Sequence, residues 1–129
     1  LVDHVRVYKK NEDFNNINVT LKVNMENETV SGTGLWLSGG SISSGYPGGL
    51  QMEAVEQTSL WEVTLILPPN SDHTYKFRNG YYPETWSGGW ESLNGDCGTG
   101  QYNDRFLSVG IQDTVLQAVC FGECTACEQ

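Results

Sequence analysis

The sequence predicts an all-β protein that folds as an antiparallel β-sandwich, and three observations lead to this fold class. Several short segments alternate apolar and polar residues with the period of two that half-buried strands show. Groups of glycine, proline and asparagine separate these segments and indicate turns. No segment keeps the period of an amphipathic helix over a useful length. Short strands that alternate with turns are typical of two packed antiparallel sheets.

The strand candidates can be followed along the chain. Residues 17–25 form the clearest one, because Ile17, Val19 and Leu21 alternate with polar side chains. Residues 60–67 have a similar pattern and end at two consecutive prolines. The remaining candidates are residues 35–37, 50–55, 73–78, 106–109 and 114–121. A further β-rich segment at residues 2–8 brings the expected number to about seven or eight strands.

Three strand segments contain aromatic residues whose placement follows from this alternation. Trp61 shares a face with Val63, and we expect both side chains in the core. Tyr75 and Phe77 are two residues apart, so they share a face and are also expected to point inward. The placement of Trp36 stays open, because the leucines on either side of it point to the opposite face.

The composition limits the possible partners. A chain of 129 residues suggests one domain with a modest core. The net charge is −9 and only seven residues are Lys or Arg, so nucleic acid and anionic membrane surfaces are poor partners. No apolar run approaches the roughly 18 residues that a membrane-spanning helix needs. We therefore expect neither nucleic acid nor membrane as a partner.

The four cysteines indicate disulfide bonds. An even number in a small acidic chain favours an oxidising compartment, so we expect a secreted protein. We favour the pairs Cys97–Cys120 and Cys124–Cys127, because the first would link a loop to the last strand. The alternative is a zinc site, since Cys124 and Cys127 have the spacing of a zinc knuckle. No second pair with that spacing is present.

The segment with the most distinctive composition is residues 79–91, called the aromatic loop below. Four rings occur within ten residues, at Tyr81, Tyr82, Trp86 and Trp90. Interleaved glycines and a proline exclude a long helix, and we expect two or three of the rings to be exposed. Flat exposed rings suit a ligand with apolar faces and hydroxyl edges, and sugars are the commonest ligand of this kind.

Polar side chains in and near the aromatic loop are candidates for hydrogen bonds to a sugar. They are Asn79, Glu84, Glu91 and Asn94, together with Lys76 and Arg78 on the preceding strand. The chain contains no catalytic triad, phosphate loop or zinc-protease motif. Glu84 and Glu91 are a weak match to the carboxylate pair of glycoside hydrolases, so we expect a non-catalytic protein.

Two short clusters of oxygen-bearing residues raise the question of a bound metal ion. Residues 94–96 and the pair Asn103 and Asp104 could supply oxygen ligands to calcium. Their spacing differs from that of an EF-hand, and such clusters are usually turns. An ion pair with Arg105 or another base is an alternative role for Asp104. The sequence therefore predicts no cofactor.

The order of motifs between residues 17 and 121 resembles carbohydrate-binding module families 48 and 20, which bind starch and glycogen. The matching segments are LWLSG at residues 35–39, LWEVTL at residues 60–65 and YKFRNG at residues 75–80. The resemblance implies an immunoglobulin-like antiparallel β-sandwich that binds glucan through exposed aromatic residues. Tyr81, Tyr82 or Trp86 occupies the position of one family aromatic. Tyr46 is the substitute for a second one, which is a tryptophan in the families.

A second resemblance concerns the start of the chain. The sequence LVDHVRVY at residues 1–8 is similar to the closing strand of family 16 glycoside hydrolases, which include the laminarinases. It implies that residues 1–10 are the remnant of a preceding catalytic domain or a first strand. Residues 11–16 would then be a linker and residues 17–129 a binding module. The carbohydrate would be β-1,3-glucan.

These observations lead to one functional hypothesis and three alternatives. The hypothesis is a non-catalytic module of a secreted polysaccharidase, monomeric and tethered to its catalytic domain, that binds laminarin-like β-1,3-glucan. One alternative is binding of an α-glucan such as starch or glycogen. Another is a structural or interaction domain without glycan binding, in which the aromatic residues pack against a neighbouring domain. The last alternative is a small hydrolase.

Overall fold

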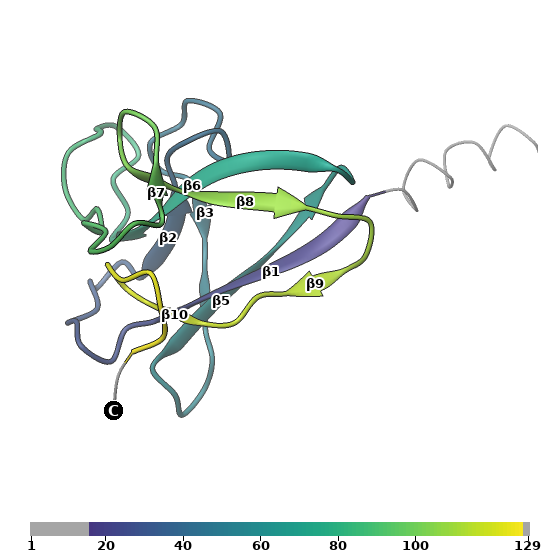
Figure 1. Cartoon of the computed structure of the whole chain (residues 1–129). Coiled ribbons are helices and arrows are strands. Elements are labelled where there is room, and N and C mark those ends of the chain that lie inside the picture. The colour runs from purple at the N-terminus through teal and green to yellow at the C-terminus, as the bar shows by residue number, and fades with distance from the viewer. Residues whose placement is uncertain (1–15, 128–129) are drawn as a thin grey trace, which may run out of the picture.

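A computed structural model of the chain describes residues 16–127, which fold into ten strands without any helix. This confirms the predicted all-β class. The strands form two sheets, each with five strands, and antiparallel pairs predominate (Figure 1). Within the described part of the chain there is accordingly no helix that could span a membrane.

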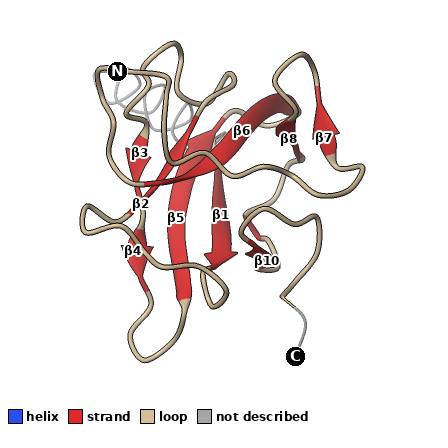
Figure 2. Cartoon of the chain, turned by 90° about the vertical axis from the view of Figure 1, so that its left-hand side faces the viewer, coloured by secondary structure: helices blue, strands red, loops and turns tan. Residues whose placement is uncertain are grey.

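The first sheet is organised around a long antiparallel pair. Strand β1 (Ile17–Asn24) pairs with β5 (Leu60–Leu67) over its whole length. Strand β4 (Glu53–Ala54) lies on the far side of β5. Strands β9 (Thr114–Val115) and β10 (Val119–Cys120) both run parallel to β1 on its other side. Figure 2 shows this order from β4 through β5 and β1 to β10.

The second sheet is organised around β6 (Ser71–Asn79), the longest strand. One end of β6 pairs with β2 (Leu35–Ser38), which in turn pairs with β3 (Leu50–Gln51). The other end pairs with β8 (Asp104–Val109), followed by β7 (Gly98–Thr99) at the edge. The half of β6 that contacts β2 therefore lacks β8 as a neighbour, and other residues complete its hydrogen bonds.

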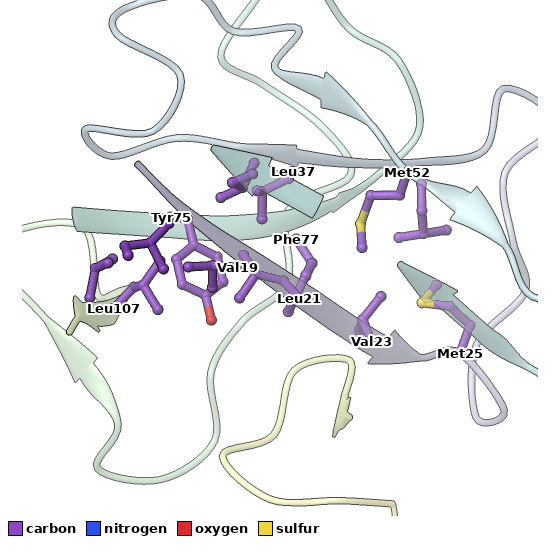
Figure 3. Packing of buried hydrophobic residues seen from close by; sticks show 13 residues of the cluster. Val19, Leu21, Val23, Met25, Leu37, Met52, Tyr75, Phe77 and Leu107 are labelled. Carbon is purple, nitrogen blue, oxygen red and sulfur yellow. The ribbon is translucent and has the colours of Figure 1, made fainter. Parts of the chain in front are cut away.

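The core lies between the two sheets and follows the predicted alternation. Val19, Leu21 and Val23 of β1 are buried, and the residues between them are more exposed. Tyr75 and Phe77 of β6 face them across the core, as Figure 3 shows, which confirms their inward placement. Trp61 and Val63 are partly buried and pack against the same cluster. Side chains from both sheets thus share one apolar interior.

Two predicted strands are divided in the structure, and one strand was not expected. The segment 50–55 breaks at Met52, where the chain leaves the second sheet and enters the first. Met52 is buried, and its N–H donates to the carbonyl of Leu35. The segment 114–121 breaks into β9 and β10. Strand β7 arises because residues 98–99 pair with the start of β8, a contact that a two-residue pattern could not reveal.

The predictions for the start of the chain fall on residues whose structure is not described. The strand expected at residues 2–8 lies wholly outside the described residues, as does the proposed remnant at residues 1–10. Of the expected linker at residues 11–16, only Asn16 is described. The proposed domain division remains a prediction.

The prediction of disulfide bonds is confirmed, but the predicted pairing is wrong. Cys97 pairs with Cys124, and Cys120 pairs with Cys127. All four thiols are used, so the zinc alternative for Cys124 and Cys127 is excluded. Two intramolecular disulfides are consistent with an oxidising compartment.

The reason for the observed pairing is a tight reversal of the chain after β10. The N–H of Cys120 donates to the carbonyl of Thr125, and the N–H of Glu123 donates back to the carbonyl of Cys120. This turn brings Cys127 back to Cys120. Asn94 lies beside the same turn, because its N–H donates to the carbonyl of Gly122. Cys97 therefore meets Cys124 and not β10 itself.

The two disulfides are expected to differ in their contribution to stability. Cys97 and Cys124 are separated by 27 residues, whereas Cys120 and Cys127 are separated by seven. Loop-closure entropy predicts about 3.5 kcal/mol for the first crosslink and about 2.5 kcal/mol for the second. Urea denaturation of the two paired Cys→Ser variants measures this difference. Equal losses, or a larger loss for the short loop, would contradict the entropic account.

Candidate binding cleft

Two loops come together on the outer face of the second sheet. One is the aromatic loop, and the other is the glycine-rich and serine-rich segment of residues 39–49, which follows β2. The aromatic loop continues the sheet beside the free half of β6, because Trp90 forms an antiparallel bridge with Arg78. The N–H of Asn79 also donates to the carbonyl of Gly89. In Figure 1, the loops next to β7 lie at the same end of the molecule as β2 and β3.

The side chain of Arg78 holds the two loops together. Arg78 is completely buried, although it points away from the core on the outer face of β6. All five of its N–H groups have acceptors, each a backbone carbonyl oxygen. Nε donates to Gly88, Nη1 to Pro47 and Tyr82, and Nη2 to Thr85 and Ser87, at 2.7–3.3 Å. Four acceptors belong to the aromatic loop and one to the segment 39–49.

Two aromatic rings also contact the Arg78 guanidinium. Its central carbon lies 4.2 Å from the centroid of the Trp90 ring and 4.8 Å from that of the Tyr82 ring. Burial lowers the pKa of Arg78 from its usual value, but a guanidinium remains charged in proteins. Among the ion pairs of the described residues, none involves Arg78. Carbonyl dipoles and ring faces therefore compensate its charge.

Beside Arg78 the loops enclose a surface cleft of about 640 Å³. Its lining combines aromatic rings, two glycines and one side chain of each charge: Gly39, Gly40, Lys76, Trp86, Trp90, Tyr102 and Asp104. Lys76 lies on the outer face of β6, two residues before Arg78, and Asp104 begins β8. The cleft is thus built on the sheet surface between the two loops.

The indoles of Trp86 and Trp90 form one wall of the cleft. Their ring centroids are 6.2 Å apart, with an angle of 11° between the ring planes. The Trp90 Nε1–H donates to the carbonyl of Trp86 at 2.7 Å. Trp90 is half-buried against Gly39 and Arg78, where a Cβ on Gly39 would lie 3.3 Å from its ring. Trp86 is 52% exposed and can contact a ligand.

The polar groups of the cleft are Lys76 and Asp104. The Lys76 Nζ donates to the carbonyl of Tyr102 at 2.6 Å, which positions the chain just before β8. Burial raises the pKa of the Asp104 carboxyl, and the positive charge of Lys76 opposes this shift. Asp104 does not pair with Arg105, whose carboxylate partner is Glu91. The cleft therefore offers hydrogen-bonding groups of both charges beside apolar walls.

The structure separates the four rings of the aromatic loop into different roles. Tyr81, Tyr82 and Trp86 are exposed and Trp90 is half-buried, which agrees with the expected two or three exposed rings. Trp86 and Trp90 line the cleft. Tyr81 lies apart from it, with its hydroxyl 2.7 Å from that of Tyr46. Tyr82 packs over Arg78 and the glycines of the loop, so its ring shapes the loop.

Two of the predicted polar ligand-binding residues make hydrogen bonds within the protein, and the burial of one of them, Glu91, corrects its assignment. Asn79 connects the loop to the segment after β1, because its side chain accepts from Ser31 N–H and donates to the carbonyl of Thr29. Glu91 is buried, and its oxygens accept four hydrogen bonds. The donors are Arg105 Nε and Nη2, Phe77 N–H and Gly122 N–H.

The remaining polar candidates divide in the same way. Glu84 is exposed and keeps its place as a candidate. Lys76 lies in the cleft, but Arg78 has no donor left for a ligand. Glu91 also has no free group for a ligand, because its carboxylate oxygens accept hydrogen bonds inside the protein.

The cleft also contains residues that the sequence did not assign to sugar binding. Tyr102 is 69% exposed, and it reaches the cleft because β8 pairs with β6. Gly39 and Gly40 line it because the chain after β2 must pass close to Trp90 and Thr74. In the sequence, Tyr102 is distinguished only by lying four residues before the predicted strand at residues 106–109. That signal becomes useful only when the pairing of β8 with β6 is known.

The oxygen-bearing residues considered for calcium have different surroundings. Asn94 and Asp96 are exposed, and Asp104 lies in the cleft next to Lys76. Within residues 16–127, no group of three or more histidine, cysteine, aspartate or glutamate side chains is arranged to hold a metal ion.

Comparisons with known proteins give no family for this chain. No protein-family model matches the sequence, and no curated protein matches it. The class of the protein therefore follows from its fold and its site alone. It is a disulfide-linked all-β domain with a cleft lined by aromatic residues on the outer face of one sheet.

Proposed function

We propose that this chain is a non-catalytic carbohydrate-binding module that binds a neutral β-glucan, with laminarin-like β-1,3-glucan as the ligand. The observation that carries the proposal is the cleft formed by Trp86, Trp90 and Tyr102 around Lys76 and Asp104. Sugar rings have apolar C–H faces and hydroxyl edges. Exposed indole and phenol rings accommodate the faces, and the two charged side chains can bind the hydroxyl groups.

The charge distribution supports a neutral ligand. The chain has a net charge of −9, which repels polyanionic polysaccharides such as alginate over long distances. Inside the cleft, Lys76 and Asp104 offset each other, so the cleft has no excess of either sign. A glucan without charged groups avoids the repulsion and still finds a donor and an acceptor. Curdlan, laminarin and starch are ligands of this kind.

The arrangement of carboxylates supports binding without hydrolysis. Glycoside hydrolases use a pair of carboxyl groups, about 5–10 Å apart, on either side of the scissile bond. Asp104 is the one carboxylate among the described lining residues of the cleft. Of the pair Glu84 and Glu91 considered for hydrolysis, Glu91 is buried in its pair with Arg105. Binding alone is therefore the simpler role.

The wider architecture forms part of the proposal. The two sheets would make an immunoglobulin-like sandwich, supported by the shared core of β1, β2, β5, β6 and β8. The module would belong to a secreted polysaccharidase, supported by the two disulfides. A preceding family 16 catalytic domain would be held near its polymer, which raises the effective concentration of the enzyme.

Replacing Trp86 by alanine is expected to weaken glucan binding about tenfold, because one sugar face loses a stacking surface worth about 1.4 kcal/mol. The unmodified chain should bind laminarin with a Kd on the order of 10 μM to 1 mM. Trp86→Ala should still fold, because Trp90 donates to the backbone carbonyl of residue 86 and not to its side chain. Isothermal titration calorimetry with laminarin, curdlan, starch and alginate measures these affinities.

The matched control is Ile66→Ala, which removes an exposed apolar side chain from β5 in the first sheet. Its affinity for laminarin should equal that of the unmodified chain. Preference for starch over laminarin would support the α-glucan alternative. Lack of binding to every glycan tested would refute a carbohydrate-binding function.

A further inference from the structure

An asparagine followed by a glycine is the step at which a polypeptide most readily modifies itself without an enzyme. The chain contains two such steps, Asn79–Gly80 and Asn94–Gly95. The backbone nitrogen of the glycine can attack the side-chain carbonyl carbon of the asparagine, because glycine has no Cβ that hinders the approach. In a folded chain, the asparagine side chain must first leave its contacts and turn toward that nitrogen. The surroundings of each asparagine therefore decide whether its step can react.

The Asn79 side chain is held by two hydrogen bonds to the backbone of a distant segment. Its Oδ1 accepts from the N–H of Ser31 at 2.8 Å, and its Nδ2 donates to the carbonyl of Thr29 at 3.0 Å. The N–H of Asn79 also donates to the carbonyl of Gly89, and Gly80 is buried. Attack on the Asn79 side chain would have to break both side-chain hydrogen bonds at the end of β6. The fold therefore protects this step.

The Asn94 side chain has different surroundings. Asn94, Gly95 and Asp96 are all exposed, and the chain bends at Gly95 and Asp96, outside the strands. Asn94 is held through its backbone, whose N–H donates to the carbonyl of Gly122 at 2.8 Å. Because its carboxamide is at the surface, it can rotate toward the Gly95 nitrogen without breaking a side-chain hydrogen bond to any of residues 16–127.

The fold also requires a glycine after Asn94. Gly95 has a φ of +129°, in a region that residues with a side chain rarely adopt. A Cβ at Gly95 would lie 2.8 Å from the Sγ of Cys124, which is bonded to Cys97. A larger residue at this position would shield Asn94 from attack, but the packing against the disulfide excludes it. The reactive step is therefore part of the disulfide region.

We propose that Asn94 is a site of spontaneous deamidation in the folded protein, whereas Asn79 is protected. The Gly95 nitrogen loses its proton to solvent and forms a bond to Cγ of Asn94. The Asn94 Nδ2 takes a proton from solvent and leaves as ammonia, which closes a succinimide ring. Water then opens the ring at one of its two carbonyls and leaves an aspartyl or an isoaspartyl residue. This inference goes beyond the proposed function and does not depend on it.

The product changes the surface beside the Cys97–Cys124 disulfide. The new carboxylate adds one negative charge to a chain whose net charge is −9. In the isoaspartyl product, the backbone between residues 94 and 95 also becomes longer by one methylene group, next to the hydrogen bond to Gly122. The modified chain should therefore elute later than the unmodified chain in anion-exchange chromatography.

Incubation of the full chain at physiological temperature and slightly alkaline pH tests the inference, once in buffer and once in urea with the disulfides reduced. Trypsin cleaves after Arg78 and Arg105, and no other lysine or arginine lies between them, so one peptide contains both steps. Fragmentation of this peptide in a mass spectrometer measures conversion at each asparagine. In the folded chain, Asn94 should convert at least about tenfold faster than Asn79, which must first break two hydrogen bonds. In urea, the two rates should become similar, because that protection is lost.

Each result decides the inference. If Asn94 stays intact in the folded chain over the time in which it converts in urea, the proposed site is refuted. Equal rates at Asn94 and Asn79 in the folded chain would refute the protection of Asn79. Asn94→Gln is the control variant, because the longer side chain closes its ring much more slowly and the position is exposed. It should lose the late-eluting form, and persistence of that form would place the modification at another residue.

Discussion

Replacing Arg78 by methionine is expected to lower the free energy of unfolding by at least about 4 kcal/mol. Methionine can fill much of the space of the arginine stem, but it has no N–H groups. The substitution removes the donors of five backbone carbonyls, four of them in the aromatic loop. These bonds are part-buried, and each acceptor that water cannot reach after the substitution costs about 1–3 kcal/mol, although these costs do not add fully.

Lysine is not expected to replace Arg78. Its ammonium group has three donors at one point, whereas the guanidinium presents five donors in a plane. The acceptors of Arg78 surround that plane, from Pro47 on one loop to Thr85 and Gly88 on the other. Arg78→Lys should therefore recover only part of the loss. The difference between the two variants reports the geometry of the group and not its charge.

Three measurements check the Arg78 prediction. Urea denaturation gives the loss of stability, tryptophan fluorescence reports the environment of Trp86 and Trp90, and hydrogen exchange reports opening of the aromatic loop. Lys76→Met is the matched control, because Lys76 is on the same face of β6 and donates one hydrogen bond to a carbonyl. Its loss should be about 1 kcal/mol. Similar losses for both variants would contradict the role assigned to Arg78.

The core strands could be predicted because the pattern that identifies each of them lies within its own sequence. In β1, β5 and β6, side chains that face the core alternate with those that do not, and this alternation is local. Strands β7, β9 and β10 are each two residues long and exist only where a neighbouring strand supplies the partner. Their bounds depend on register, which a single sequence does not specify.

The candidate site was predictable in its aromatic residues and less so in its polar ones. Trp86 and Trp90 stand out in composition, so the cleft wall could be anticipated. Arg78 and Glu91 look like exposed charged residues in the sequence, because the strand pattern does not show which backbone groups and side chains cover them. Arg78 reaches the carbonyl of Pro47 from 31 residues away, and Glu91 meets Gly122 across 31 residues. Such partners become visible only in three dimensions.

The disulfide pairing has the same limitation. The prediction used the idea that a loop cysteine should join the last strand. The structure shows that the turn after β10 brings Cys127 back to Cys120, so Cys120 is not the partner of the loop cysteine. The geometry of that turn decides the partner of Cys97, and the spacing of the cysteines does not contain it.

The buried pair of Glu91 and Arg105 completes the free half of β6. Arg105 is the first residue of β8 that pairs with β6. Its Nε donates to Glu91 Oε2 at 2.8 Å, and its Nη2 donates to Glu91 Oε1 at 2.7 Å. Glu91 accepts from the N–H of Phe77, and its own N–H donates to the carbonyl of Phe77. Arg105 also donates to the carbonyl of Glu123 near the disulfides. The pair therefore connects β6, β8 and the C-terminal turn.

Replacing Arg105 by methionine is expected to cost about 3–5 kcal/mol, because the carboxylate of Glu91 stays buried without its cation. The double variant Glu91→Gln with Arg105→Met is expected to be more stable than Arg105→Met alone. Glutamine removes the negative charge and keeps a carbonyl oxygen that can accept from Phe77 or Gly122. Adding a second substitution should thus restore stability.

Urea denaturation of both single variants and the double variant at neutral pH provides the double-mutant cycle. Lys22→Met is the control, because Lys22 lies opposite Glu62 on the partly exposed pair β1 and β5 and should lose less than about 1 kcal/mol. A double variant less stable than Arg105→Met would mean that the hydrogen bonds of Glu91 outweigh its unpaired charge. If the double variant is the more stable of the two, the main cost of Arg105→Met is the buried negative charge of Glu91, which Arg105 otherwise offsets.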